Sequence, residues 1–132
     1  MKDFRELKVW EKAHQLVIDF YAESQSFPRE EIYGLTAQLR RSAVSVPSNI
    51  AEGCGRDGDA DLARFLQIAM GSASEMEYQL LLAFDLGYLK REAYDRLNER
   101  IREVKRMLAS FLQTLRHKSP PHRSQLSSAT GR

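Results

Sequence analysis

Cysteine and long apolar runs are both scarce in this chain of 132 residues. Cys54 is the single cysteine, which excludes an internal disulfide framework and a zinc site built from clustered cysteines. No apolar run approaches the roughly 18 residues that spanning a bilayer requires, and the opening MKDFRELKVWEKAHQ has no apolar core typical of a secretion signal. We therefore expect a cytoplasmic protein with no membrane partner.

Residues that carry catalysis are sparse too. His117 and His122 fall at or beyond the end of the last expected helix, and His14 has no second histidine at metal-binding spacing. The glycines of GCGRDGD do not follow a strand, and the chain has no GKS or GKT motif, so a phosphate-binding loop is not indicated. The sequence therefore predicts no catalytic residue, metal site, cofactor or small-molecule substrate.

Charge is nearly balanced, with 20 Lys and Arg against 18 Asp and Glu. Four of the basic residues and none of the acidic ones follow Leu115. Residues 1–115 therefore contain 16 basic and 18 acidic residues and have a net charge of −2. The tail RHKSPPHRSQLSSATGR has almost nothing apolar to bury, and we expect it to be disordered from about residue 118, after a domain of residues 1–117. Four basic residues in the tail favour a solubilising end over an electrostatic arm for nucleic acid.

Helical periodicity extends through the rest of the chain, because apolar residues recur at spacings of three and four between short breaks. No stretch has the alternation of a strand. We expect an all-α, antiparallel up-down-up-down four-helix bundle. Pro47 lies inside the second helix and removes a backbone hydrogen bond, which predicts a kink. The first, second and fourth helices are expected at about residues 4–24, 30–53 and 90–116. The third helix is expected to begin at a cap formed by Asp57 or Asp59 and to end at Gly87 in a left-handed conformation.

Three of these helices have a clear apolar stripe for the core. The stripes comprise Ile32, Leu35, Leu39, Ala43, Val46 and Ile50; then Leu62, Leu66, Ala69, Ala73, Met76 and Leu80; then Ala93, Leu97, Ile101, Val104, Leu108, Phe111 and Leu115. A run of small residues around Gly71 suggests a notch for close helix packing. Glu77 borders its stripe and should have a partner, for which we expect Arg40.

The first helix has more apolar surface than a bundle needs. At 100° per residue its apolar side chains fill an arc of about 200°, whereas a stripe of about 100° is enough to face a core. The third helix shows a weaker excess. Either the flanks of this arc cover a loop, or, as we favour, the excess forms a subunit interface. The expected interface residues are Val9, Trp10, Leu16, Val17, Phe20, Ile68 and Leu82.

Outward arginines are the candidate contacts for a polyanion. Arg102 and Arg106 lie on one outward arc of the fourth helix, where pairs such as Glu99–Arg102 and Glu103–Arg106 would make a solvated face. Arg41 points away from the core beside small hydroxyl residues, a combination that suits phosphate contacts. Because residues 1–115 are slightly acidic, binding to nucleic acid must depend on local arginine clusters repeated by assembly.

The segments YGLTAQLRRSAVSVPSNIAEGCGR and RFLQIAMGSASEMEYQL closely resemble the bacterial four-helix bundle family named for 23S rRNA intervening sequences. The opening FRELKVWEKAHQL is similar to the first helix of that family, and the resemblance covers about residues 3–115. It implies a ring-like homopentamer and distant kinship to the accessory variability proteins of diversity-generating retroelements, which bind nucleic acid and a reverse transcriptase. No catalytic residue carries over; the matching basic positions are Arg40, Arg41, Arg56 and Arg64.

Three functional hypotheses follow. The first is a non-enzymatic oligomer that binds structured RNA, or an RNA–protein complex, through Arg40, Arg41, Arg56, Arg64, Arg102 and Arg106. The second is a protein-interaction scaffold in which the same arginines are merely solvated. The third is an enzyme using Glu52, Glu77 or Cys54, which would require a deep pocket with convergent polar groups.

Overall fold

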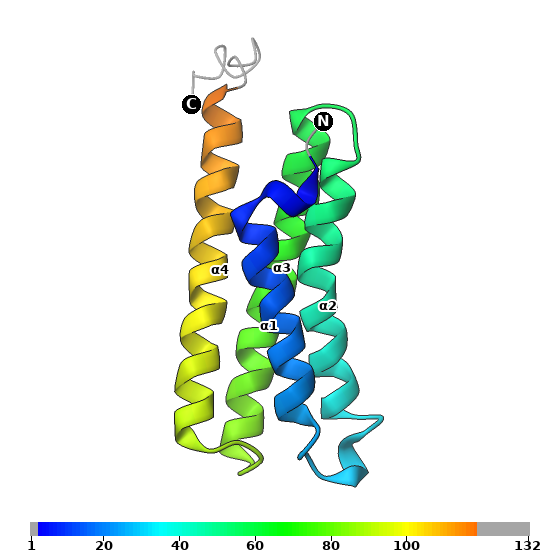
Figure 1. The fold of residues 1–132 in the computed structure, drawn as a ribbon, viewed down its shortest axis with the longest axis vertical. Helices are drawn as coiled ribbons and strands as arrows, with labels where there is room; N and C mark the ends of the chain where they lie inside the picture. The colour runs from blue at the N-terminus through cyan, green and yellow to red at the C-terminus, as the bar shows by residue number, and fades with distance from the viewer. Residues whose placement is uncertain (1–2, 119–132) are drawn as a thin grey trace, which may run out of the picture.

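The computed structural model describes residues 3–118, so the expected disordered tail lies outside the described residues except for its first residue, Lys118, which is helical. No strand occurs between residues 3 and 118. The elements are the short 3₁₀ helices η1 (Phe4–Glu6) and η2 (Arg29–Glu31) and the helices α1 (Lys8–Ser24), α2 (Leu35–Cys54), α3 (Asp59–Asp85) and α4 (Arg91–Lys118) (Figure 1).

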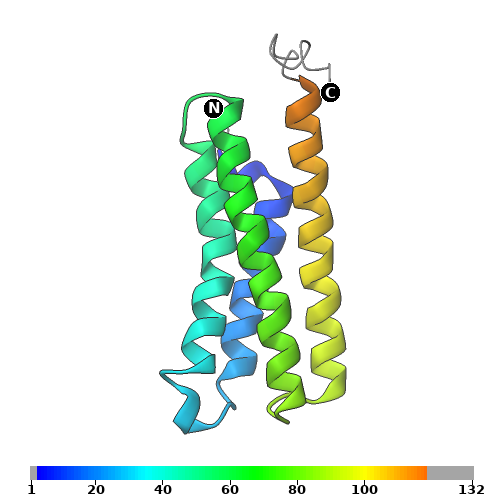
Figure 2. The same cartoon turned by 180° about the vertical axis from the view of Figure 1, so that it is seen from behind.

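The four long helices lie side by side as a bundle. In Figure 1 α1 lies in front between α4 and α2, and Figure 2 shows α3 on the opposite side. Contacts between neighbours pair residues in opposite order: Lys12 meets Glu103 whereas Glu23 meets Arg96, so α1 and α4 run in opposite directions. The four-helix fold expected from the periodicity is confirmed.

The core is a single apolar cluster that runs through the bundle. Most of the expected stripe residues are buried in it, among them Leu39, Leu66, Ile101 and Leu108. Leu62, Ala93 and Phe111 are half-buried against this cluster. Ile32 is 47% exposed, because α2 begins three residues later and leaves Ile32 in the connection. Within the described residues, no helix combines the length and apolar character needed to cross a membrane.

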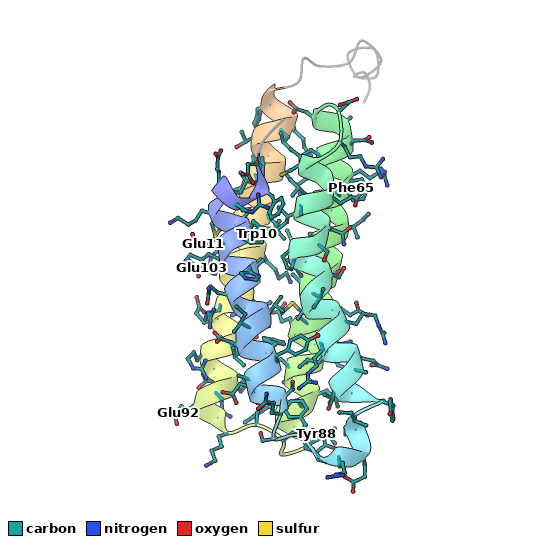
Figure 3. All side chains as sticks on the ribbon, turned by 45° about the vertical axis from the view of Figure 1, so that its right-hand side comes forward. Trp10, Glu11, Phe65, Tyr88, Glu92 and Glu103 are labelled. Atoms are coloured by element: carbon teal, nitrogen blue, oxygen red, sulfur yellow. The ribbon has the colours of Figure 1, made fainter. Side chains whose placement is uncertain are left out.

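The first two helices begin later than the periodicity predicts. Leu7 is extended (φ −87°, ψ 126°) and separates η1 from α1. A carboxylate oxygen of Glu31 accepts the backbone N–H of Leu35 at 3.0 Å, which satisfies an otherwise unpaired donor at the first residue of α2. The other oxygen of Glu31 accepts the hydroxyl of Tyr88 at 2.8 Å, so one side chain joins the two connections at this end of the bundle, where Figure 3 labels Tyr88.

Both ends of α3 are set by glycine. The expected aspartate cap is wrong: the N-cap is Gly58, with φ at 88° and no side-chain hydrogen bond, while Asp59 and Asp61 lie in the first turn. At the other end the left-handed Gly87 is confirmed (φ 83°), and Tyr88 N–H donates to the carbonyl of Ala83 at 2.9 Å, as in a Schellman motif. Pro47 is buried inside α2, and the kink expected there stays a prediction.

The close helix packing expected at Gly71 is found at Gly53 instead. A Cβ added at Gly71 would meet nothing within 4 Å, so Gly71 does not serve a notch within this chain. Gly53 does, because its added Cβ would lie 2.9 Å from Leu62 Cδ1 and 3.0 Å from Phe65 Cβ. The end of α2 therefore approaches the start of α3 closely, and a side chain at Gly53 would force the two helices apart.

Replacing Gly71 with alanine is expected to raise the free energy of unfolding by about 0.5–1 kcal/mol, because the new methyl meets open space while the helix loses a flexible residue. Urea denaturation monitored by circular dichroism measures this. Gly87→Ala is the matched control and should lower stability by about 1–2 kcal/mol, since a Cβ is strained at φ 83°. Destabilisation by Gly71→Ala would contradict the prediction and indicate a partner packed on that face.

Candidate functional site

Charge is divided unevenly between two neighbouring helices. α4 has eight basic and four acidic residues, whereas α3 has one basic and five acidic residues. The two helices pack against each other, so part of this difference is used in ion pairs between them. A polyanion can bind only the basic side chains that stay exposed after those ion pairs have formed.

Two arginines of α4 are engaged with α1. Arg96 Nη2 donates to Glu23 Oε2 at 3.0 Å, and Arg100 Nη1 pairs with Asp19 Oδ2. Lys12 of α1 reaches back to Glu103 at 3.2 Å, and Figure 3 shows Glu103 beside α1. These three ion pairs join α1 to α4.

Glu77 pairs with α4, so the expected pair with Arg40 is wrong. Lys105 Nζ donates to Glu77 Oε1 at 2.8 Å, and Arg102 Nε donates to Oε2 at 3.4 Å. The physical reason is that Glu77 lies on the side of α3 that faces α4, whereas Arg40 faces α1. The hydrogen bond from Lys105, followed by its charge and the contact with Arg102, lowers the pKa of Glu77 below 4.5, against the opposing effect of partial burial.

Glu77 should make stability depend on pH. A carboxyl whose pKa is lowered by folding binds fewer protons in the folded chain, so its contribution is complete above pH 4.5 and is lost as the pH falls through the lower folded value. At pH 7 we expect Glu77→Gln to lower the free energy of unfolding by about 1 kcal/mol or less, as is usual for a partly exposed pair. Urea midpoints at pH 7 and pH 3 for both proteins measure this. A constant difference between them across this range would contradict the prediction.

Arg40 is mainly a structural residue. Its Nε donates to Ser24 Oγ at 2.8 Å and its Nη2 donates to the carbonyl of Tyr21 at 3.3 Å. The guanidinium also lies 4.7 Å from the centre of the Tyr21 ring. Arg40 thus ties α2 to the end of α1 through two of its five N–H donors.

Arg56 and Arg64 come together on one aromatic ring that the sequence did not single out. Their guanidinium carbons lie 5.0 and 4.5 Å from the centre of the Phe65 ring, which Figure 3 labels on α3. Acidic residues surround this pair: Glu52 accepts two N–H groups of Arg56, Asp61 lies 3.8 Å from Arg64, and the α2–α3 connection adds Asp57. The local charge therefore opposes phosphate binding at this end of the bundle.

Arg102 and Arg106 stay at the surface of α4. Arg102 is 58% exposed at its side chain, and Arg106 is held by a single contact of 3.3 Å with Glu99. The expected pairs of Arg102 with Glu99 and of Arg106 with Glu103 are wrong, because Glu77 and Lys12 from neighbouring helices take those positions. Exposed pairs of this kind stabilise by only about 0–1 kcal/mol, so both arginines can exchange a carboxylate for a phosphate.

Arg41 lies in a groove between α2 and α3. The groove has a volume of about 350 Å³, and Ser42, Ser45, Ser72, Glu75 and Gln79 line it with Arg41. Sequence reasoning missed Glu75 and Gln79 as parts of this site. Their signal was a polar stripe on α3 at spacings of three and four, Ser72, Glu75 and Gln79, which faces a similar stripe on α2.

Three of the expected interface residues are internal. Val9, Leu16 and Phe20 are buried in the core of the chain, so assigning them to a subunit interface is wrong. The apolar arc of α1 is wide because α1 packs against α2 on one side and α4 on the other. Trp10, Val17 and Leu82 are half-buried and Ile68 is exposed; for these four residues the interface stays a prediction.

Trp10 lies at the α1–α2 seam, as Figure 3 shows. Its ring stacks on His14, with centroids 4.9 Å apart, and packs against Phe4 at the same distance. This aromatic cluster presents an apolar surface between two helices.

The three residues considered for catalysis are either buried or engaged in ion pairs. Cys54 is buried, Glu52 holds Arg56, and Glu77 holds two cations of α4. A larger groove of about 650 Å³ lies between the start of α1 and α4, lined mainly by apolar side chains such as Leu7, Val9, Met107 and Phe111. Among the described residues, no group of three or more His, Cys, Asp or Glu side chains is placed to hold a metal ion.

Comparisons with known proteins agree with this architecture. The sequence of residues 5–110 matches the family described as 23S rRNA-intervening sequence protein. The fold is similar to a crystal structure of a protein of unknown function from the S23 ribosomal protein family of Bacteroides thetaiotaomicron, with a TM-score of 0.74 and 27% identity over 80% of this chain and 95% of that one. A search of curated proteins gave no match. This chain belongs to the 23S rRNA-intervening sequence protein family.

Proposed function

We propose that this protein is a non-enzymatic oligomer that binds structured RNA through arginines exposed on α4 and α2. The observation that carries the proposal is the basic excess of α4, where Arg102 and Arg106 are exposed and held only by weak surface pairs. The family name, which refers to 23S rRNA, supports the choice of RNA as the polyanion.

Assembly is part of this proposal, because one subunit offers few free cations. Arg41 lines the α2–α3 groove whereas Arg102 and Arg106 lie on α4, so one subunit offers small separate sites, and several copies around a symmetry axis would add their contacts along one RNA. Of the expected interface residues, Trp10, Val17, Ile68 and Leu82 keep surface for contact with another copy. A pentamer is the assembly that the sequence resemblance implies.

Fluorescence anisotropy with labelled fragments of 23S rRNA tests the RNA proposal. We expect binding at 50 mM salt, and we expect the logarithm of the association constant to fall linearly with the logarithm of the salt concentration. The reason is that phosphate contacts release counterions from the RNA. Absence of binding at low salt, or an affinity that does not depend on salt, would overturn it.

Light scattering tests assembly. We expect a mass several times the 15.2 kDa of one chain and a smaller species for Trp10→Asp. A single 15.2 kDa species at micromolar concentration would overturn the oligomer proposal. Glu11→Gln, a change at an exposed position on the same helix, is the control and should leave the mass unchanged.

A protein-interaction scaffold is the second candidate. Tyr33 favours it, because this side chain is 94% exposed and stands in the α1–α2 connection that Glu31 fixes in place. A partner that the original chain captures from nuclease-treated extract, and that Tyr33→Ser fails to capture, would support a scaffold over RNA binding.

A further inference from the structure

The groove between α2 and α3 carries opposite charges on its two walls. Arg41 stands exposed on α2 and Glu75 stands exposed on α3, and both line the same volume of about 350 Å³. They form no ion pair with each other, and neither has a hydrogen-bond or ion-pair partner elsewhere in residues 3–118. Most other arginines of the described chain are paired with a carboxylate, so this unpaired set is unusual here.

The floor of the groove is polar and already hydrogen-bonded. Ser42 Oγ donates to Gln79 Oε1 at 2.9 Å, and the hydroxyls of Ser45 and Ser72 lie 2.7 Å apart. Asn49 Nδ2 donates to Ser45 Oγ at 3.0 Å and holds that hydroxyl in place. The Ser42–Gln79 and Ser45–Ser72 contacts cross from α2 to α3 and fix the spacing of the two walls. A ligand therefore enters a preformed groove and makes its strong contacts with Arg41 and Glu75.

The two charged groups favour a ligand that has both a pair of acceptors and a pair of donors. A guanidinium offers two parallel N–H donors and a carboxylate offers two acceptor oxygens, so each recognises a matching pair of atoms on a rigid framework. Guanine has both pairs: its O6 and N7 accept from an arginine, and its N1–H and N2–H₂ groups donate to a carboxylate. Adenine places an acceptor and a donor together on its N7 and N6 edge, so it cannot satisfy a guanidinium with two acceptors.

We propose that this groove binds an unpaired guanine of RNA, with Arg41 reading O6 and N7 and Glu75 reading N1–H and N2–H₂. The inference rests on the proposed RNA-binding function and adds the base that is read. Unpaired bases in loops and bulges are the usual targets of sequence-specific RNA recognition, because all their edges are accessible. The negative wall also explains why an acid sits on this RNA-binding surface, since a site for phosphate alone would exclude Glu75.

The experiment uses the full chain and two labelled 12-nucleotide RNAs, each of uridines with one central purine, guanine in one and adenine in the other. We expect the guanine RNA to bind about 5- to 150-fold more tightly, the discrimination typical of a bidentate contact. Arg41→Gln and Glu75→Gln should each remove most of that preference. Both positions are exposed, and far-ultraviolet circular dichroism checks that the variants stay folded.

Arg106→Gln is the matched control, because Arg106 lies on α4 and not in the groove. It should weaken binding of both RNAs alike and leave the preference for guanine unchanged. Equal, salt-dependent binding of the two RNAs would overturn the guanine site and leave the proposed RNA-binding function standing.

If neither RNA binds, the titration with 23S rRNA fragments still decides the proposed binding of structured RNA, and titration with guanosine and adenosine monophosphates decides the groove alone. A preference for the guanosine nucleotide that disappears in Arg41→Gln and Glu75→Gln supports the site. Equal binding of the two nucleotides, or binding of neither, overturns it.

Discussion

Replacing Phe20 with alanine is expected to lower the free energy of unfolding by about 3–5 kcal/mol. The Phe20 side chain is 1% exposed and belongs to the apolar cluster that runs through the bundle. Removing the ring takes away its burial and leaves a cavity that the neighbouring helices fill only in part. Because a domain of this size is stable by about 5–15 kcal/mol, this single change removes a large share of the total.

Guanidinium chloride denaturation at one fixed protein concentration measures the effect, since the stability of an oligomer depends on concentration. The matched control is Ile18→Ala two residues away on α1, where the side chain is 49% exposed and the expected loss is below about 1 kcal/mol. A small loss for Phe20→Ala together with dissociation into monomers would show that Phe20 lies in a subunit interface, against the structure.

The double substitution of Arg102 and Arg106 by glutamine is expected to weaken RNA binding by about 100-fold or more, because each arginine supplies a charge-assisted hydrogen bond of about 1.5–3 kcal/mol and about 1.4 kcal/mol corresponds to tenfold in affinity. The slope of log K against log salt should become shallower by about 0.7–0.9 for every phosphate group that the protein no longer neutralises. Fold stability should change little, since both side chains take part only in exposed pairs. Anisotropy titrations across a series of salt concentrations measure both the affinity and the slope.

Arg40→Gln is the matched control for charge. It removes one positive charge, where the double variant removes two, from a side chain whose Nε and Nη2 groups donate to Ser24 and Tyr21. We expect it to lower stability while leaving the salt slope nearly unchanged. An unchanged RNA affinity in the double variant, or a shallower slope in Arg40→Gln, would show that the arginines of α4 are not the phosphate contacts.

Much of the bundle could be predicted from the order of residues alone. Spacings of three and four place residues such as Leu66 and Ile101 on inward faces, and both are buried. Gly87 was predictable as the end of α3, because few other residues tolerate its φ of 83°. These features are local: they depend on helical geometry and on backbone conformations that single residue types favour.

The candidate site was much less predictable. Sequence spacing paired Glu77 with Arg40 and Arg106 with Glu103, whereas partners from neighbouring helices took both acids. Spacing along one helix shows which residues share a face, but not which residues of another helix stand opposite them. Phe65 between two arginines and Glu75 opposite Arg41 depend on how α2 and α3 are aligned along the bundle.

The wide apolar arc of the first helix shows the same division. The number and spacing of its apolar residues were sufficient to predict a helix with more than one buried side. Only the packing of α1 between α2 and α4 decided that Val9, Leu16 and Phe20 face the interior, while Trp10 and Val17 keep surface. Periodicity thus determined the helices and most of their inward residues. Tertiary packing decided which arginines are free, because an ion pair or an interface depends on distances between segments far apart in the chain.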